Sequence, residues 1–184
     1  GIEIGVAATK TFFAQLLSFY GLAIKFAQIK GTQSNQEISE LISELTNLPP
    51  IIQDLLDKHN KSSEKLAHDF FNIRDVIFLG RGINYPIALE GALKLKEISY
   101  IHAEGYAAGE LKHGPIALVD ENVPVIGILP TNKIFNKTAS NLAEVYARGG
   151  KIISITDQKG AKKINDISSY IFSIEECSEL CQPL

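Results

Sequence analysis

The chain has 184 residues, of which 45% are hydrophobic and 21% are charged, and its formal net charge at pH 7 is -3. This length and composition are typical of a soluble globular chain that buries a core, with one domain or one domain and part of another. Acidic and basic residues are mixed along the chain, which argues against an extended surface for nucleic acid or for an anionic membrane. A local phosphate site remains compatible with this pattern.

No secretory signal is visible at the start of the sequence, and the cysteines form no metal motif. No basic segment followed by a short apolar run opens the chain, so we expect a cytosolic protein. Because the chain starts at Gly1 and has no methionine, we expect residues to precede it in the parent protein. Cys177 and Cys181 have no matching second pair, and the four histidines are scattered, so no metal site is predicted.

The first 30 residues predict a long helix. Apolar residues recur every three or four positions over residues 9–30, and Gly31 follows them as glycine follows many helix C-termini. The polar side chains of this segment, among them Gln15 and Lys25, fall on one helix face. We therefore interpret it as a packed amphipathic helix and not as a membrane span.

The next 40 residues predict several shorter helices. A helix over residues 38–45 is expected to stop before Pro49 and Pro50, because a residue that precedes proline avoids helical dihedral angles. Two further helical runs are expected at residues 51–58 and 63–71.

From Asp75 onward the pattern changes to strands that alternate with helices. The expected order is strand 76–79, a helix from about Tyr85, strand 123–129, helix 133–148, strand 151–156, a short polar helix and strand 170–174. Runs of valine and isoleucine flanked by helices indicate a parallel sheet covered on both faces, and thus a three-layer α/β domain. The sequence stops at Leu184, soon after the last strand, so we expect a missing covering helix and one sheet face with exposed apolar area.

The densest group of ionisable residues lies in the helix expected at residues 88–100. Offsets of four and seven place Glu90, Lys94 and Glu97 on one face of that helix. From spacing alone, the simpler interpretation is a solvated ladder of salt bridges. A catalytic carboxylate with a neighbouring cation is the other interpretation.

Two histidines are candidates for proton transfer. His113 lies in a short polar turn, and histidine titrates near neutrality, so with a carboxylate it supplies the minimum needed to open and enolise a sugar. His102, close to Glu104, offers the same chemistry, and the sequence does not rank the two. Gly80-Arg81-Gly82, between a strand and a helix, suits a phosphate but is equally explained as a tight turn.

Three segments resemble a known family: Gly80-Arg81-Gly82, the run PIALEGALKLKEISY at residues 86–100, and the run AAGELKHGP at residues 107–115. They resemble the isomerase domain of the glucosamine-6-phosphate synthase family. The resemblance implies two sugar isomerase (SIS) subdomains, each a flavodoxin-like parallel sheet between helices, behind a glutaminase domain. We accordingly expect residues 1–60 to be the C-terminal helices of the first subdomain and a connector, and residues 61–184 to be the second subdomain without its C-terminal end.

The same resemblance implies an enzyme that converts fructose 6-phosphate and glutamine into glucosamine 6-phosphate and glutamate. Glu97 is then expected to move the proton between C1 and C2 after an imine forms at C2, with Glu90 and Lys94 in the same pocket. His113 matches the histidine that opens the fructose ring in a neighbouring subunit, which implies a homodimer. No redox or metal cofactor is implied.

The chain also departs from the family pattern. Bacterial relatives usually carry serine where this chain has Ala8, so one hydroxyl contact to the substrate is expected to be lost or shifted, although Val6 and Ala8 still offer backbone groups. The family's phosphate-clamping loop is expected upstream of Gly1, and its closing lysine tail beyond Leu184. Because the sequence shows no glutaminase domain and no cysteine at its amino end, the chain by itself is not expected to draw ammonia from glutamine. The alternatives are a non-catalytic sugar-phosphate-binding SIS regulatory module, a simple aldose-ketose isomerase and a dimerisation domain.

Overall fold

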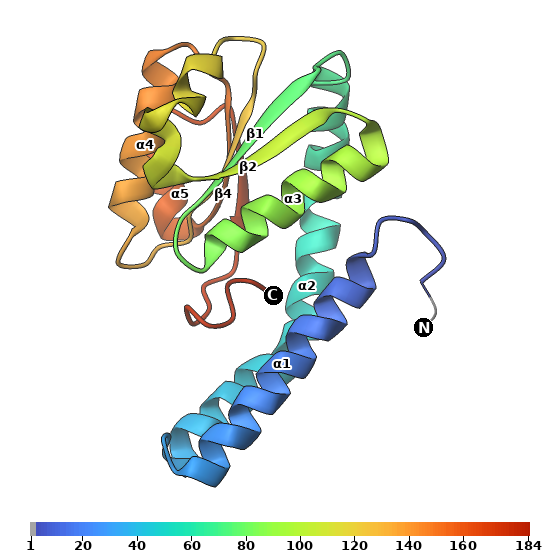
Figure 1. Ribbon diagram of the computed structural model, residues 1–184, viewed down its shortest axis with the longest axis vertical. Coiled ribbons are helices and arrows are strands. Elements are labelled where there is room, and N and C mark those ends of the chain that lie inside the picture. The colour runs from blue at the N-terminus through green and yellow to red at the C-terminus, as the bar shows by residue number, and fades with distance from the viewer. Residues whose placement is uncertain (1–2) are drawn as a thin grey trace. The chain divides into compact units, whose positions relative to one another are not determined.

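The computed structural model describes residues 3–184 and divides the chain into two compact units (Figure 1). The first unit extends to Asp54 and includes Leu184, and the second runs from Leu55 to Pro183. Helix α1 (Thr9–Lys30) belongs to the first unit, whereas helix α2 (Asn35–Asp69) begins there and ends in the second. All β-strands lie in the second unit.

Helix α1 confirms the helix expected over residues 9–30. Gly31 ends it in the left-handed conformation, with φ 60°, and its N–H bonds back to the carbonyl groups of the last turn. None of the residues of α1 is buried, and Phe19, Phe26 and Ile29 are each at least 60% exposed. By length and mean hydropathy (1.3), this helix could cross a membrane, and no other helix in residues 3–184 meets that test.

Helix α2 corrects the expectation of separate helices around the two prolines. It is one helix of 35 residues with Pro49 and Pro50 in its interior. Proline in a helix removes a hydrogen bond and costs about 3 kcal/mol, yet the least exposed side chains keep a spacing of three and four straight through this point. These residues are Ile38, Leu41, Leu45, Leu48, Ile52 and Leu55. Both prolines are exposed, so they do not interrupt the row of apolar residues on the other side of the helix. Packing of this apolar row outweighs the cost of the two prolines and keeps α2 continuous.

The second unit is built on a five-stranded sheet in the order β2-β1-β3-β4-β5, in which every pairing is parallel. The strands are β1 (Asp75–Gly80), β2 (His102–Ala107), β3 (Val125–Ile128), β4 (Ile152–Asp157) and β5 (Tyr170–Ile174). This is the flavodoxin-like order, with a reversal of direction between β1 and β3. The expected α/β class and the four predicted strands are confirmed.

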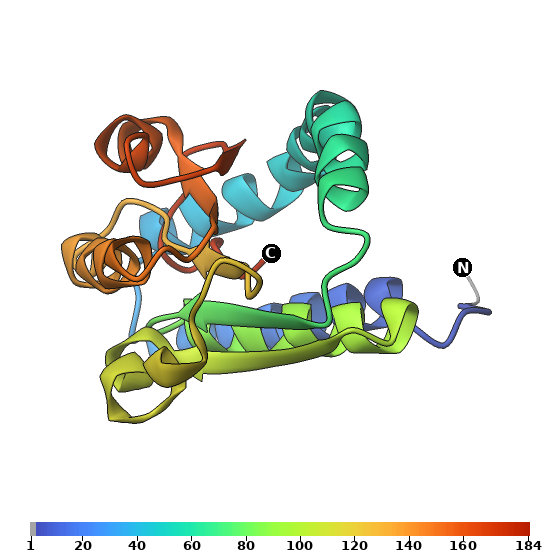
Figure 2. The ribbon, with the colours of Figure 1, turned by 90° about the horizontal axis from the view of Figure 1, so that it is seen from above.

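Helical segments cover both faces of the sheet, as Figure 2 shows from above. On one face, the core includes Leu79, Leu142 and Ile152 and is closed by η1 (Ala108–His113), α4 (Phe135–Ala147) and α5 (Gln158–Ile164). The core of the other face includes Phe78, Ala88 and Ala92 and lies under α3 (Asn84–Ser99). The end of α2 also lies on this second face, where His59 Nε2 is 2.8 Å from the Ser173 carbonyl oxygen. A second short helix, η2 (Pro115–Leu118), follows η1.

Strand β2 is not predicted by the sequence analysis, which assigns no helix or strand to residues 102–107. Its inward side chains are small, and only Ala103 is buried. At Gly105 a Cβ atom would stand 2.9 Å from the backbone of Leu89, because α3 passes close over this strand. The packing therefore requires small residues here, and the valine-rich pattern that marks the other strands is absent.

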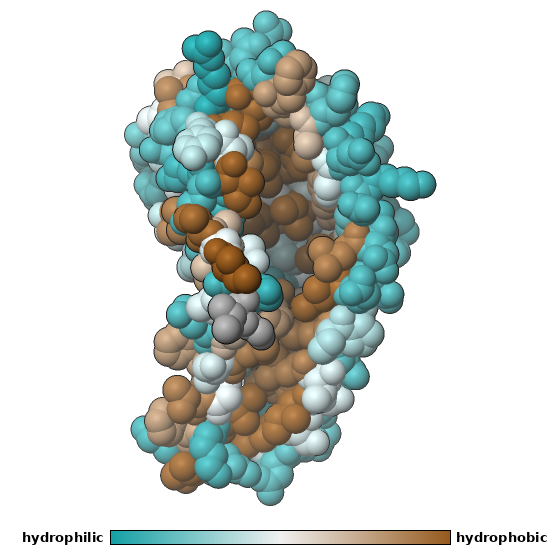
Figure 3. Space-filling model, turned by 90° about the vertical axis from the view of Figure 1, so that its right-hand side faces the viewer, coloured by the Kyte–Doolittle hydropathy of each residue, from teal (hydrophilic) through white to brown (hydrophobic). Residues whose placement is uncertain are grey.

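A hollow lies on the α3 side of the sheet. It has a volume of about 660 Å³, and brown apolar side chains line the hollow in the upper part of Figure 3. Its lining includes Leu66, Phe70, Val76, Leu95, Ile126 and Ile153.

Candidate active site

The structure brings together three of the predicted site residues on helix α3. The Nζ atom of Lys94 lies 2.7 Å from Oε2 of Glu97 and 3.4 Å from Oε1 of Glu90. The three side chains are only 18 to 27% exposed, which is low for charged residues of a surface helix. They lie opposite the helix face whose alanines, Ala88 and Ala92, pack on the sheet.

This arrangement stabilises the charged form of the lysine. The hydrogen bond from Lys94 to Glu97 raises the pKa of Lys94 above its ordinary value; partial desolvation opposes the shift and the charge of Glu90 adds to it. Oε2 of Glu97 accepts this bond, while Oε1 of Glu97 has no partner among residues 3–184. The site thus holds a fixed carboxylate with one oxygen available for proton transfer.

In the turn before α3, the N–H groups at the helix start, which are candidate donors for a phosphate, bond to backbone carbonyl groups instead. The N–H groups of Asn84 and Tyr85 donate to the carbonyl groups of Arg81 and Gly82, and Pro86 has no N–H group. Gly82 has φ 58°, a conformation that favours glycine. The tight-turn interpretation of Gly80-Arg81-Gly82 is therefore correct for these donors.

His113 does not join the α3 group within this chain. It is the last residue of η1, it is exposed, and its imidazole has no hydrogen bond or ion pair in the described part of the chain. It follows strand β2 at the carboxyl edge of the sheet, the edge where open α/β sheets bind ligands. A donor side chain that is exposed and unpaired is able to reach a second molecule.

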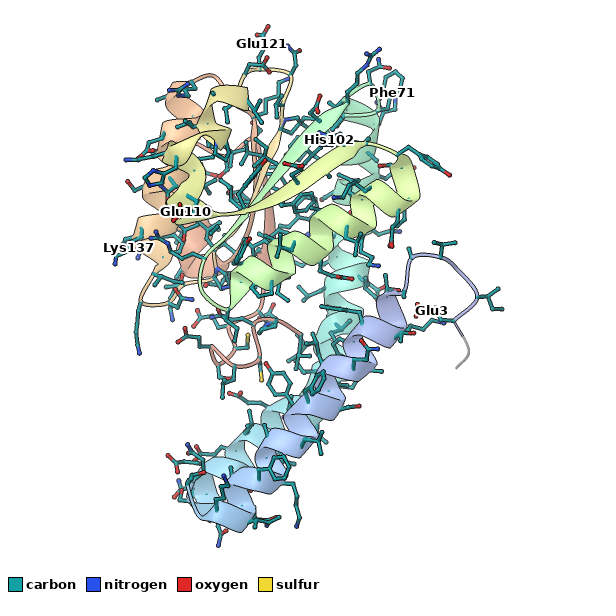
Figure 4. All side chains as sticks on the ribbon, viewed as in Figure 1. Glu3, Phe71, His102, Glu110, Glu121 and Lys137 are labelled. Atoms are coloured by element: carbon teal, nitrogen blue, oxygen red, sulfur yellow. The ribbon has the colours of Figure 1, made fainter. Side chains whose placement is uncertain are left out.

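His102 lies at the opposite end of the same strand, as the labels of His102 and Glu110 in Figure 4 show. Its Nδ1 is 2.8 Å from Oδ1 of Asp75 and its Nε2 is 3.5 Å from Oε1 of Glu104. The hydrogen bond with Asp75 raises the pKa of His102; desolvation opposes this and the charge of Glu104 supports it. The position of His102 at the amino edge of the sheet and the contacts of both its ring nitrogens are typical of a structural role.

Val6 and Ala8 precede helix α1 in the first unit. Val6 is 87% exposed, and Ala8 caps the helix without a side-chain hydrogen bond. The carboxylate of Glu3 takes over this capping role, because it accepts hydrogen bonds from the N–H groups of Lys10 and Thr11 at 3.0 and 2.9 Å. Bonds from the hydroxyl and N–H groups of Thr11 lower the pKa of Glu3 to about 2. Within residues 3–184, no cluster of histidine, cysteine and carboxylate side chains has metal-binding geometry.

The comparison with known proteins identifies the family. The SIS domain model matches residues 69–178, which include the whole sheet and the α3 site. The chain belongs to the SIS domain family. The SIS domain expected from the sequence is thereby confirmed, and similar proteins extend the match over the whole chain.

Comparisons with individual proteins support this family assignment. The chain is 50% identical over 184 residues to the glutamine–fructose-6-phosphate aminotransferase (isomerizing) of Rhizobium meliloti strain 1021, and 50% identical over 186 residues to that of Gloeobacter violaceus. Each match covers 100% of this chain and 30% of the relative. A solved structure, the C-terminal domain of glucosamine-fructose-6-phosphate aminotransferase from Francisella tularensis, superposes with a TM-score of 0.95 at 43% identity, over 100% of this chain and 51% of that chain. The chain thus spans less than a third of its curated relatives.

Proposed function

We propose that this chain is the isomerase part of a cytosolic enzyme that converts fructose 6-phosphate and glutamine into glucosamine 6-phosphate and glutamate. The observation that carries the proposal is the Lys94–Glu97 pair on α3, in a SIS domain that is similar over its full length to aminotransferases of this name. Residues 1–60 are then the end of a first sugar isomerase subdomain with its connector, and residues 61–184 are most of the second.

In this reaction, Glu97 is the base that moves a proton between C1 and C2 of the open-chain sugar, once ammonia has formed an imine at C2. Lys94 holds Oε2 of Glu97, so that Oε1 keeps a fixed direction toward the substrate. Glu90 restrains Lys94 from the other side, and the Val6 and Ala8 backbone contributes to sugar binding.

His113 opens the fructose ring in this proposal, and it acts on the site of a second subunit. Its exposed imidazole at the carboxyl edge of the sheet supports this assignment, because it is accessible to a second subunit and histidine titrates near neutrality. The protein is therefore proposed to work as a homodimer, with ammonia supplied by a glutaminase domain.

The decisive experiment measures the interconversion of fructose 6-phosphate and glucose 6-phosphate by the full-length protein that contains this chain. Glu97→Gln keeps the shape of the side chain but removes the base, so the rate at saturating sugar should fall about a hundredfold or more. Glu64→Gln, at an exposed position of α2, is the matched control and should retain wild-type activity.

An unchanged rate for Glu97→Gln would mean that Glu90, Lys94 and Glu97 form only a structural set of salt bridges. It would favour a non-catalytic sugar-phosphate-binding module. Sugar affinity, measured by titration calorimetry, separates this outcome from a general loss of binding. For His113→Ala, mixing inactive Glu97→Gln subunits with inactive His113→Ala subunits should restore part of the activity if His113 acts across the dimer.

A further inference from the structure

The segment that carries His113 packs against helix α4. Helices η1 and α4 close the same face of the sheet, and Figure 4 labels one residue of each, Glu110 and Lys137. Leu111 of η1 lies in the buried core of this face together with residues of α4 such as Leu142. The imidazole of His113 is therefore exposed, although the backbone that carries it belongs to a packed layer.

Polar side chains of α4 hold this segment at three places. Asn141, Glu144 and Arg148 follow one another at intervals of three and four residues, so they lie on one face of the helix. The amide of Asn141 lies against two carbonyl groups and, with Nδ2 turned toward them, donates to the carbonyl oxygen of Ala108 at 3.1 Å. Oε1 of Glu144 lies 2.8 Å from Nζ of Lys112. Nη1 of Arg148 donates to a carbonyl group of η2 at 3.3 Å.

Three consecutive residues of η1 point in three directions. A 3-10 helix has three residues per turn, so neighbouring side chains are about 120° apart. Leu111 is fully buried in the core, and Lys112 reaches Glu144 on α4. The remaining direction is that of His113, and Gly114 follows it with φ 147°, a conformation that favours glycine. Fixing the first two directions therefore fixes the third.

The contact between Lys112 and Glu144 matters more for direction than for stability. The two side chains are 60% and 28% exposed, and ion pairs this accessible to water contribute little to the free energy of unfolding. A displacement of about 1 Å at a reacting group, in contrast, costs about a hundredfold in rate. Loss of this ion pair should thus leave the fold intact and still misdirect the imidazole.

We infer that Glu144, through Lys112, is a positioning residue that orients His113 for ring opening. The inference rests on the proposed function, because it needs His113 to open the fructose ring of a second subunit. Ring opening breaks the bond between C2 and the ring oxygen, removes a proton from the C2 hydroxyl group and adds one to the ring oxygen. The imidazole must reach these oxygen atoms at hydrogen-bond distance, so its direction limits the rate.

The experiment compares two sugars with the full-length protein that contains this chain. Fructose 6-phosphate has to be opened, whereas 5-deoxyfructose 6-phosphate lacks the hydroxyl group that closes the ring and is always open. Glu144→Ala should slow the isomerisation of fructose 6-phosphate about tenfold or more and leave that of the 5-deoxy sugar at the wild-type rate, as followed by NMR of the sugars. Glu121→Ala removes an exposed glutamate and should match wild type with both sugars.

Lys112→Ala tests the other half of the ion pair. It should show the same selective loss with fructose 6-phosphate, and the variant with both changes should lose no more than either single variant, because one contact is removed in each case. The unfolding temperature of Glu144→Ala should stay close to that of wild type.

Two results would overturn the inference: Glu144→Ala slows both sugars equally, or it slows neither. Losses that multiply in the variant with both changes would also contradict it, because Lys112 and Glu144 would then act separately. Glu97→Gln distinguishes this failure from failure of the proposed function. It should abolish the reaction of both sugars, since both need the proton transfer between C1 and C2, and full activity of Glu97→Gln would overturn the proposed function itself.

Discussion

Lys94 lies closer to Glu97, three residues along α3, than to Glu90, four residues back: the two distances are 2.7 and 3.4 Å. The shorter contact is the main cause of the raised pKa of Lys94. We therefore expect Glu97→Gln to bring the pKa of Lys94 down toward its ordinary value of 10.5, as followed by NMR of the lysine side chain. Lys159, whose pKa is raised by Glu176, is the internal control and should not change.

The pH dependence of the stability that the Lys94–Glu97 pair contributes is also testable. Because the folded-state pKa of Lys94 is raised, its pairing stabilises the fold below the unfolded-state pKa, and this contribution is lost as the pH rises through the folded value. The stability difference between wild type and Glu97→Gln should accordingly narrow at strongly alkaline pH. A difference that grows there would contradict the pairing.

Gly80, the last residue of β1, leaves no space for a side chain. A Cβ atom there would stand 2.2 Å from the carbonyl oxygen of Asn84, a backbone atom that cannot move aside. Gly80→Ala should therefore lower the free energy of unfolding by about 1–3 kcal/mol or more, measured by urea denaturation. The same change at Gly21 in α1, where a Cβ atom meets nothing within 4 Å, should stabilise by roughly 0.5–1 kcal/mol because alanine favours helices.

Asp157 joins the end of β4 to the start of α5. It is 3% exposed, and its carboxylate accepts bonds from the N–H groups of Lys159 and Gly160 and from the hydroxyl and N–H groups of Thr131. Burial raises its pKa, but these bonds together outweigh burial and lower the pKa below 3.8. Asp157→Ala should cost about 2 kcal/mol at pH 7, whereas Asp166→Ala, at an exposed position, should cost little.

The pH dependence of this effect has a defined direction. A depressed carboxyl pKa contributes stability that is present above the unfolded-state pKa and lost as the pH falls through the folded value. Urea midpoints of wild type and Asp157→Ala should thus converge below pH 3.8. Midpoints that stay equally far apart in acid would show that packing, and not charge, sets the effect.

His102 should titrate above its ordinary pKa of 6.5, because Asp75 accepts its Nδ1–H bond. Asp75→Asn is expected to move the pKa of His102 down, as followed by the imidazole proton signals, while the exposed Glu121→Gln is expected to leave it in place. A raised histidine pKa means that this pair stabilises the fold below pH 6.5 and that the contribution disappears as the pH rises through the folded value. An unchanged pKa in Asp75→Asn would assign the shift to Glu104.

The sequence was most informative where burial and periodicity coincide. Strands β1, β3, β4 and β5 are apolar because both of their faces are covered, so their pattern could be read directly. The stripe of Glu90, Lys94 and Glu97 also followed from helical spacing, and the structure shows the contacts that spacing predicts.

What could not be predicted depends on contacts between distant residues. Strand β2 contains Ala103 and Gly105 because α3 passes close over it, and small residues give no strand signal. Helix α2 continues through Pro49 because of its row of apolar side chains, although proline ordinarily ends or kinks a helix. The contacts of α4 with η1 and η2, such as that of Arg148 with Ile116, join residues 32 positions apart and have no sequence motif.

The parallel sheet also has a consequence for how the chain reaches its native state. Neighbouring parallel strands cannot be joined by a tight hairpin, so two strands can pair only after the long connection between them has folded back. The central pair, β1 with β3, matches Ile77 with Val125 across an intervening strand, helix and two short turns. Such long-range closure slows folding. We expect β1, α3 and β2, which are adjacent in the chain, to assemble first, and β5 to complete the sheet late.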